Sequence, residues 1–279
     1  MKKITRRSFL AAAGLTAAAL ALTACGGSSS STASSTASSA AASSEATSSS
    51  AAAELTTVEA GKLTMATNAT FPPYEMTTDT GAFEGIDVDT AQAIAEKLGL
   101  ELQIDDMEFD AALLSVQQGK ADIVMAGVTV TDERKAVMDF SGSYATGIQS
   151  IIVPEGSDIA TPDDLAGKKI GTQRGTTGYI YCSDDFGDEN VVAYDSGLTA
   201  VQALNNGQVD AVVIDNAPAQ EYVAANPGLV ILDTSYAEED YAIGMAKGSA
   251  LEDAINAALE ELKADGTLQS IVDKYITAE

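Results

Sequence analysis

The stretch GIDVDTAQAIAEKLG (85–99) has the pattern of one complete helix between two strands. Its apolar face is made of Val88, Ala91, Ile94, Ala95 and Leu98. These residues recur every three or four positions, and Gly99 is a typical signal for the end of a helix. Apolar runs of strand length lie on either side, at 62–67 and 101–104. This order predicts a strand–helix–strand unit with parallel strands.

The same alternation of strands and helices continues to the end of the chain. Strands are expected at 122–126, 149–153, 169–172, 191–194, 211–214, 229–232 and 241–246. Helices are expected at 109–118, from Thr131, at 162–165, from Gly175, and at 198–205, 216–225, 249–263 and 267–275. Two such sets predict an α/β protein with two lobes, each a mostly parallel sheet flanked by helices. A ligand is then expected in the crevice outside the strand ends.

The domain boundaries follow from these two sets. We expect lobe 1 to comprise residues 55–146 plus 241–279, and lobe 2 to comprise residues 147–240. The chain then crosses between the lobes twice, near 145–149 and near 233–241. Two crossovers of this kind favour a hinge motion that closes the lobes around a ligand.

The first 24 residues are predicted to be a signal peptide. Cations precede the apolar run 9–22, which is shorter than the roughly 20 residues that a bilayer span needs. Leu22-Thr23-Ala24-Cys25 resembles a bacterial lipobox, where the thiol is acylated and the chain is cut before it. The string TRRSFL (5–10) also resembles a twin-arginine signal, so either export route is open. A short core helix is the alternative, and the polar tract that follows disfavours it.

Residues 25–54 are expected to tether the domain to the outer face of the cell membrane. From 28 to 53 the tract contains only Ser, Thr and Ala apart from Glu45, so it has almost nothing to bury. A lipid on Cys25, such as palmitate, would supply the anchor. Cys182 is then a lone thiol, a residue that more often packs in a core than performs chemistry.

The composition excludes several classes of function. The formal net charge is −26, from 15 Lys+Arg against 41 Asp+Glu, which argues against a nucleic-acid partner. The chain has no His and only two Cys, so we expect neither a metal site nor His-based catalysis. No cofactor is expected either.

The region from Lys62 to Tyr275 resembles the polar amino-acid-binding proteins of bacterial ABC importers. The group includes glutamine-, histidine- and lysine/arginine-binding proteins. The resemblance rests on the order and spacing of ATNATFPPYE (66–75), GIDVDTAQAIAEKLG (85–99), FDAALLSVQQGKADI (109–123), AGVTVTDERKAVMDFS (126–141), GKKIGTQRGTTG (167–178), DAVVIDNAPA (210–219) and DGTLQSIVDKY (265–275). Thr90 departs from the group's pattern, which prefers an apolar residue there. The resemblance implies a type II periplasmic-binding-protein fold that captures a free amino acid, acts as a monomer and passes its ligand to an ABC permease.

The resemblance also implies a set of ligand-binding residues. They are Asn68, Phe71, Phe109, Ala126, Gly127, Thr129, Arg134, Gln173, Thr176, Thr177 and Asp215. Phe71 and Phe109 would cover the ligand, with Tyr74 as a neighbour, and Asn68 and Gln173 would tune side-chain specificity. Without the resemblance, aromatic residues that follow a strand are more often part of a core.

The chemistry of an amino acid explains the charged members of this set. Arg134 can hold a carboxylate with both arms of its guanidinium, although a surface ion pair with Asp132 or Asp139 is the alternative. Gly127 and Thr129 can offer main-chain and hydroxyl groups. Asp215 follows a buried strand and can oppose the ammonium, or it can cap the next helix instead.

The segment Gly175-Thr176-Thr177-Gly178 opens a helix whose free N–H groups favour an anion. A plain turn is the simpler interpretation of such a segment. Phosphate is a less suitable anion, because the loop lacks the Lys-Ser/Thr ending of a P-loop.

Two alternatives share this fold. Cyclohexadienyl dehydratases are similar to the group and would make the chain an enzyme, although nothing in it indicates a catalytic acid beyond the binding aspartate. An extracellular amino-acid sensor is the second alternative, and the sequence does not separate it from a transport receptor.

Asn68 predicts the class of ligand. Relatives that take basic amino acids, and the glutamine binders, carry Asp at the matched position, whereas Asn68 and Gln173 are neutral here. A cleft without a charge aimed at the ligand's side chain cannot offset the desolvation of a second charge. We therefore expect a neutral, polar or modestly apolar ligand ahead of Lys, Arg or Glu. A preference for a basic ligand would require another carboxylate in the pocket, such as Glu75 or Asp110.

Overall fold

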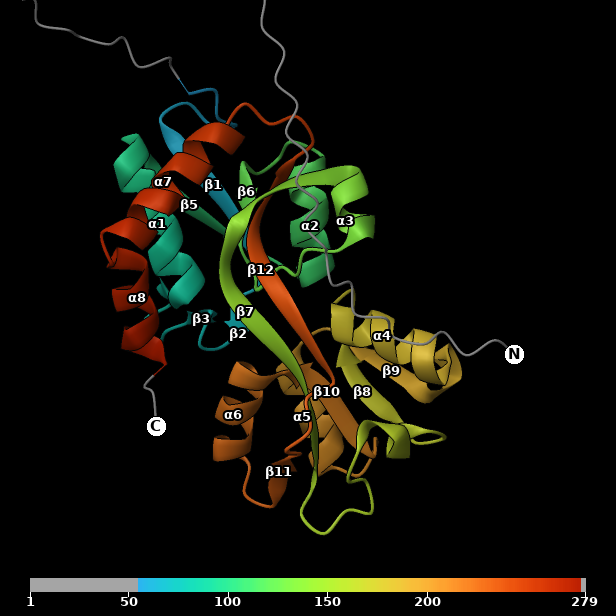
Figure 1. Cartoon of the computed structure of the whole chain (residues 1–279). Coiled ribbons are helices and arrows are strands. Elements are labelled where there is room, and N and C mark those ends of the chain that lie inside the picture. Colours follow the sequence, from blue (N-terminus) through green and yellow to red (C-terminus); the bar gives the residue numbers. More distant parts are fainter. Residues whose placement is uncertain (1–54, 277–279) are drawn as a thin grey trace, which may run out of the picture. The chain divides into compact units, whose positions relative to one another are not determined.

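A nine-stranded sheet runs through the described part of the chain, residues 55–276 of a computed structural model (Figure 1). The strand order is β5-β1-β6-β12-β7-β10-β8-β9, and β11 (Leu229–Ile231) pairs with β7. The predicted signal peptide (1–24) and the predicted lipidated cysteine with its linker (25–54) lie outside the described residues. Within residues 55–276, no helix combines the length and the apolar character needed to cross a bilayer.

Lobe 1 is built around the parallel strands β1 (Lys62–Thr67), β5 (Glu101–Asp106) and β6 (Ile123–Val124). Its helices are α1 (Ile86–Leu98), α2 (Phe109–Gln117), α3 (Asp132–Val137), α7 (Glu252–Ala264) and α8 (Thr267–Tyr275). Leu63 and Met65 of β1 pack in one cluster with Ile94 of α1, whereas Ala66 packs in another with Val116 of α2. Because side chains alternate along a strand, α1 and α2 cover opposite faces of the sheet, as expected for parallel strands.

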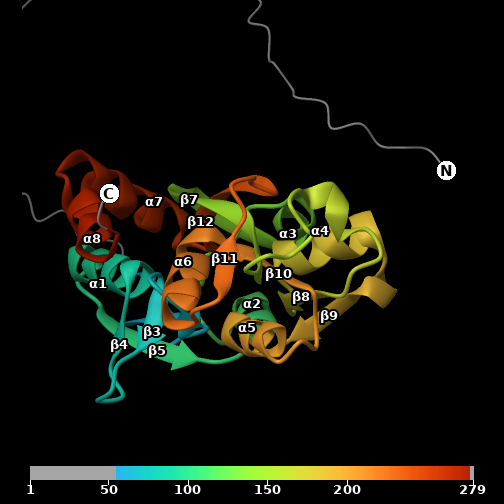
Figure 2. The same cartoon turned by 90° about the horizontal axis from the view of Figure 1, so that it is seen from below.

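Lobe 2 repeats this arrangement with β8 (Ile170–Gln173), β9 (Val191–Tyr194) and β10 (Ala211–Asp215). Its α-helices are α4 (Thr177–Phe186), α5 (Gly197–Asn205) and α6 (Asn216–Ala225), and two short 3-10 helices cover Pro162–Leu165 and Asp188–Asn190. Seen from below, α4 and α5 lie on either side of β8 and β10 (Figure 2). The predicted two-lobed α/β architecture is confirmed.

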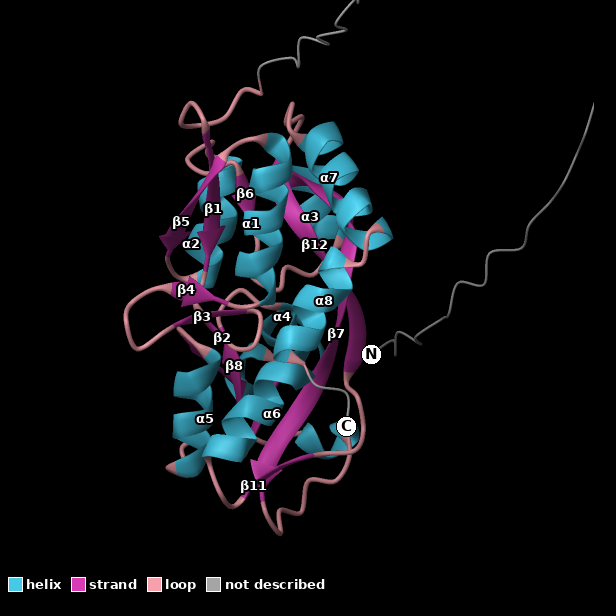
Figure 3. Ribbon diagram, turned by 90° about the vertical axis from the view of Figure 1, so that its left-hand side faces the viewer, coloured by secondary structure: helices cyan, strands magenta, loops and turns pink. Residues whose placement is uncertain are grey.

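Two long strands connect the lobes. They are β7 (Met138–Pro154) and β12 (Ala237–Ala246), and they pair antiparallel from Gln149↔Ala237 to Met138↔Ala246 (Figure 3). The sequence predicts only the apolar ends of these strands, 149–153 and 241–246. The remainder, residues 138–148 and 237–240, is rich in glycine, hydroxyl and acidic residues and lacks a strand-like hydrophobic pattern. These residues adopt strand geometry because β7 and β12 pair with each other, and not because of their own local sequence.

Close packing at Gly147 shapes this connection. The ring of Tyr241, which is fully buried on β12, lies against Gly147 of β7. A Cβ at position 147 would lie 2.5 Å from two ring carbons of Tyr241 and 2.5 Å from its hydroxyl oxygen. Only glycine leaves room for the ring, so the two strands fix the place of Tyr241 near the middle of the sheet.

A second, three-stranded sheet was not predicted. It consists of β2 (Thr70–Phe71), β3 (Glu75–Thr77) and β4 (Phe83–Glu84). These strands are too short to produce a recognisable pattern in the sequence. The pairing places Phe71 opposite Glu75.

Candidate functional site

A cavity between the lobes collects every ligand-binding residue that the sequence predicts. The cavity is narrow, and it is also lined by Glu75, which the predicted set of ligand-binding residues did not include. Lobe 1 contributes Asn68, Phe71, Glu75, Phe109, Ala126, Gly127, Thr129 and Arg134, and lobe 2 contributes Gln173, Thr176, Thr177 and Asp215. Tyr74 lies behind the cavity, stacked on Phe71 at 5.9 Å between ring centroids. Their contact with a ligand stays a prediction.

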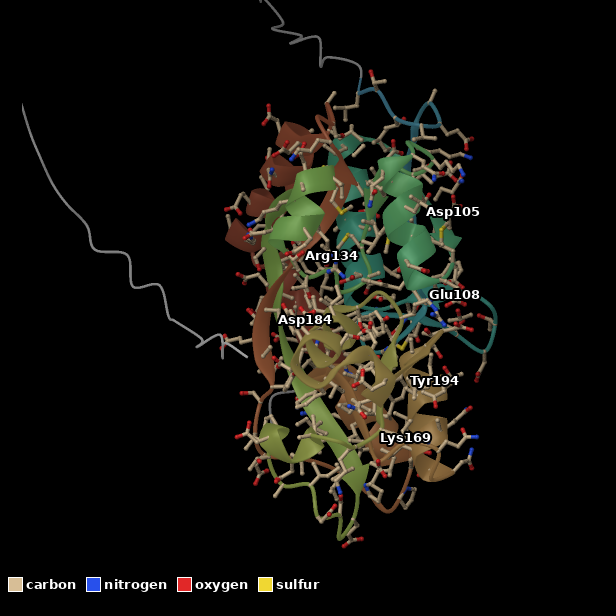
Figure 4. All side chains as sticks on the ribbon, turned by 90° about the vertical axis from the view of Figure 1, so that its right-hand side faces the viewer. Asp105, Glu108, Arg134, Lys169, Asp184 and Tyr194 are labelled. Atoms are coloured by element: carbon tan, nitrogen blue, oxygen red, sulfur yellow. The ribbon has the colours of Figure 1, made fainter. Side chains whose placement is uncertain are left out.

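Arg134 lies buried on the side of lobe 1 that faces lobe 2 (Figure 4). Thr131 caps α3 by accepting a hydrogen bond from the Arg134 main-chain N–H at 3.2 Å, which fixes the first turn that carries the side chain. The guanidinium donates to the Thr129 carbonyl at 2.7 Å and to the Gly175 carbonyl at 3.2 Å, and it lies 5.4 Å from the centroid of the Phe109 ring.

No described carboxylate forms an ion pair with Arg134. The alternative of a surface pair is wrong, because Asp139 is bound to Lys247 at 2.6 Å and Arg134 is only 8% exposed. Burial lowers the pKa of Arg134, although such a group stays charged at neutral pH. Among the described residues, the direct partners of this buried cation are thus two carbonyl oxygens and the Phe109 ring, while the charges of Glu239 and Asp215 act on it from nearby.

The loop between β6 and α3 approaches the cavity through Gly127. This residue has a φ of 55°, and a Cβ there would lie 2.9 Å from the Phe71 ring. Its N–H donates to Asp87 at 2.9 Å, so α1 holds the loop in place. A glycine is required for both the backbone conformation and the close approach of Phe71.

Asp215 does not cap α6, although it stands at the capping position. Its side chain makes no capping hydrogen bond and instead accepts from Gln149 at 2.8 Å and from the Tyr241 hydroxyl. Burial raises the pKa of Asp215 to about 7. Since both donors are neutral, this carboxylate has no described cation bound to it, and it is suited to receive one.

Glu239 joins the same network and was missed by the sequence analysis. One of its oxygens accepts from Thr177 at 2.9 Å, from Gln149 at 3.0 Å and from Thr129 at 3.2 Å. Glu239 belongs to the acidic run AEED (237–240), which by itself indicates a solvated surface. Only the pairing of β12 with β7 turns this one carboxylate inward.

The N-terminus of α4 faces the cavity from lobe 2. Thr176 caps it by accepting from the Tyr179 N–H at 3.3 Å and donates to the Gln173 carbonyl at 2.8 Å. A Cβ at Gly175 would lie 3.3 Å from Asp110 of lobe 1, so glycine allows the lobes to come close. The helix start therefore brings the positive end of a peptide dipole to the cavity near Arg134.

Direct hydrogen bonds hold the lobes together across the cavity. Gln173 donates to Asn68 at 2.8 Å, Arg134 donates to Gly175, and the Tyr222 hydroxyl donates to the Thr70 carbonyl at 2.6 Å. A ligand that used Gln173 or Arg134 would have to replace these partners. The structure is thus a closed arrangement in which the lobes must part for entry.

Glu75 changes the electrostatic interpretation of the cavity. Its side chain is fully buried, and no N–H or O–H group of the described residues donates to either of its oxygens. Burial, followed by the nearby charge of Asp87, raises its pKa well above the ordinary value. Glu75 lines the cavity together with Asn68, so the cavity contains an ionisable carboxyl group that the argument from Asn68 and Gln173 did not consider.

The comparisons with known proteins agree on one family. Residues 63–278 match the profile of the bacterial extracellular solute-binding proteins, family 3. An L-cystine-binding protein of Escherichia coli K12 is 33% identical over 226 residues, which cover 79% of this chain and 85% of that protein. An arginine-binding extracellular protein of Bacillus subtilis is 32% identical over 228 residues, covering 78% of this chain and 87% of that protein.

Solved structures show the same fold. The arginine-, lysine-, histidine-binding protein ArtJ of Geobacillus stearothermophilus superimposes with a TM-score of 0.75 at 34% identity, covering 78% of this chain and 96% of that one. An ancestral arginine-binding protein bound to glutamine gives a TM-score of 0.75 at 42% identity, and the match covers 78% of this chain and 99% of that one. An ancestral arginine-binding protein bound to arginine gives a TM-score of 0.74 at 43% identity, and the match covers 77% of this chain and 98% of that one.

Proposed function

The chain belongs to the bacterial extracellular solute-binding proteins of family 3, and from that premise we propose that it binds one polar amino acid between its lobes for delivery to an ABC importer. Members of this family act outside the cytoplasm and are not enzymes. The dehydratase alternative is therefore wrong. A sensor on the same fold would use the same ligand site and differ only in its partner.

The observation that supports amino-acid capture is the arrangement of buried charges. Arg134 and the N-terminus of α4 offer two sources of positive potential to a carboxylate. Asp215, without a bound cation among the described residues, offers a negative partner to an ammonium. An amino acid carries both groups on adjacent atoms, so it can satisfy both ends of the cavity.

The hinge is proposed to lie where β7 and β12 pass between the lobes. This division assigns residues 55–146 plus 241–279 to one moving body and 147–240 to the other. It is supported by the chain path, which crosses along β7 and returns along β12. Ligand contacts from both lobes would favour the closed state over the open one. We propose that the protein does this as a monomer.

The side-chain subsite is proposed to take a neutral polar or a cationic group. Asn68 supports a neutral ligand, and buried Glu75 supports a cationic one. Relatives solved with glutamine and with arginine support a site of this double character. The expectation of a neutral ligand ahead of Lys, Arg or Glu rests on Asn68 and Gln173 and does not include Glu75.

A thermal-shift screen of the common amino acids tests the proposed function. Polar amino acids should raise the melting temperature, because a ligand at 100 times its Kd stabilises the fold by about 2.7 kcal/mol. Asn68→Asp should move the ranking toward basic amino acids relative to neutral ones. The ranking is the readout, since the variant also loses the hydrogen bond from Asn68 to the Met107 carbonyl. If no amino acid shifts the wild type, the receptor function is contradicted.

The lipid anchor is proposed from the sequence, with Cys25 acylated and residues 28–53 as the tether. Cys25→Ser should abolish lipid attachment and leave amino-acid binding unchanged, because the site lies within the domain that follows. Fatty-acid labelling and detergent-phase partition measure lipid attachment, and calorimetry measures amino-acid binding. Cys182→Ala is the matched control and should stay labelled, since Cys182 is buried in the core of lobe 2. A labelled Cys25→Ser protein would refute the assignment.

A further inference from the structure

Two carboxyl groups lie side by side at the wall of the cavity. Glu75 comes from β3 and lines the cavity, and Asp87 comes from the first turn of α1, where it also holds Gly127. Both side chains are 0% exposed. The Asp87 N–H donates to the Tyr74 carbonyl at 2.9 Å, so the start of α1 lies against the chain at Glu75. Two neighbouring carboxyl groups can share a hydrogen bond only if one of them carries a proton.

The donors around the pair decide which carboxyl carries it. One oxygen of Asp87 accepts from the Gly127 N–H at 2.9 Å and from the Tyr144 hydroxyl at 2.8 Å. The other oxygen of Asp87 and both oxygens of Glu75 receive no hydrogen bond from an N–H or from a hydroxyl of the described residues. Asp87 is thus stabilised as the anion, and Glu75 is the natural site of a proton donated to the free oxygen of Asp87.

No positively charged side chain within residues 55–276 forms a hydrogen bond or an ion pair with Glu75 or Asp87. The ionisable groups that act on Glu75 or Asp87 are Asp215 of β10, Asp106 of β5, Tyr144 of β7, Tyr222 of α6, and Tyr74 next to β3. On the outer side of α1, Lys274 of α8 is engaged with Asp89 at 2.7 Å. The second negative charge of the pair would be buried without a partner, so it is disfavoured until a cation arrives.

Building on the proposed function, we propose that Glu75 holds an exchangeable proton and that a cationic ligand side chain displaces it. The Glu75 O–H bond breaks, its electrons stay on the carboxylate, and the proton passes to solvent as the ligand's cation takes its place. A neutral polar side chain leaves the proton where it is and can donate a hydrogen bond to the free oxygen of the Glu75 carboxyl. Glu75 therefore determines ligand specificity through its protonation.

The direction of the pKa shifts agrees with this geometry. Burial raises the pKa of Asp87 to about 6 and that of Glu75 well above its usual range, so the pair retains a proton near neutral pH. Because a cationic ligand binds the deprotonated form, its affinity should rise with pH, by up to about tenfold per unit while the free pair is protonated. The affinity for a neutral ligand should not rise with pH through Glu75.

Asp215 requires a control, because its pKa is also raised and the ammonium of any amino acid would act on it. That contribution is common to all amino acids, so the difference between a cationic and a neutral ligand isolates Glu75. L-Arginine and L-glutamine are suitable probes, since the guanidinium of arginine stays charged throughout the range.

The test is calorimetry of both probes in two buffers of different ionisation enthalpy, repeated between pH 6 and 8. Arginine should release about one proton more than glutamine near pH 7, and its Kd should fall with pH relative to that of glutamine. Glu75→Gln should remove both differences and weaken arginine by about tenfold or more, with glutamine within about threefold. Glu84→Gln, on the neighbouring strand and outside the cavity lining, should behave as wild type.

The outcomes separate the two proposals. Equal proton release by the two ligands, or binding of neutral ligands alone across this pH range, would overturn the role of Glu75 and leave amino-acid capture intact. Failure of every amino acid to bind would instead contradict the proposed function itself. The wild-type measurements decide the matter even where Glu75→Gln does not fold.

Discussion

Arg134→Lys should lose nearly as much amino-acid affinity as Arg134→Ala, about 2–4 kcal/mol or roughly 30- to 1000-fold in Kd. The guanidinium donates from two nitrogens at once, to Thr129 and to Gly175, and holds its plane near the Phe109 ring. A lysine ammonium carries the charge but cannot reproduce two parallel bonds to a carboxylate. Isothermal calorimetry on both variants with the ligand found in the screen measures the effect.

Arg174→Lys is the matched control for this prediction. Arg174 lies in the same loop region as Gly175, but its side chain is 53% exposed and its contact with Asp195 is 3.6 Å long. Its Kd should stay at the wild-type value. If Arg134→Lys binds within threefold of wild type, the two-armed grip on the carboxylate is refuted.

Asp215→Asn should weaken amino-acid binding by about tenfold or more while the protein stays folded. The asparagine keeps the shape of the side chain, and its oxygen can still accept from Gln149 or Tyr241. What it lacks is the negative charge that opposes the ammonium. Calorimetry gives the loss of affinity, and a melting curve shows that the fold is retained.

Asp210→Asn provides the comparison, because Asp210 stands just before the same strand, is not part of the cavity lining, and its carboxylate accepts from the Lys169 N–H at 2.8 Å. That variant should bind as wild type. An unchanged Kd for Asp215→Asn together with a large fall in melting temperature would assign Asp215 a structural role instead.

The sequence predicts those parts of the fold that local pattern determines. Strand β1, the end of α1 at Gly99 and helix α6 agree with prediction to within a residue, because apolar period and glycine are local signals. The first half of β7 was missed, since its residues 138–148 acquire strand geometry from the pairing with β12. The same is true of β2–β4, whose strands contain only two or three residues each.

The site divides in the same manner. Arg134 and Asp215 follow recognisable strands and motifs, so their positions could be read from the chain. Glu239 could not, because an acidic residue in a polar context indicates solvent until the tertiary structure buries it, and Glu75 was named only as a carboxylate that a basic ligand would require. The prediction of a neutral ligand was argued from Asn68 and Gln173. The charge of a cavity, however, depends on every side chain that lines it, including Glu75.

The packing of Tyr241 against Gly147 has a mechanical consequence. The Tyr241 hydroxyl donates to Asp215 of lobe 2, while its ring is held between the two strands that join the lobes. Rotation of one lobe about those strands would therefore tilt the ring and stretch or relax its bond to the carboxylate. An ammonium that competes for Asp215 would act on the same bond from the other end. A twist of the paired strands β7 and β12 and the arrival of an ammonium at Asp215 would thus act on the same Tyr241 hydroxyl. The angle between the lobes would therefore depend on whether an ammonium is bound.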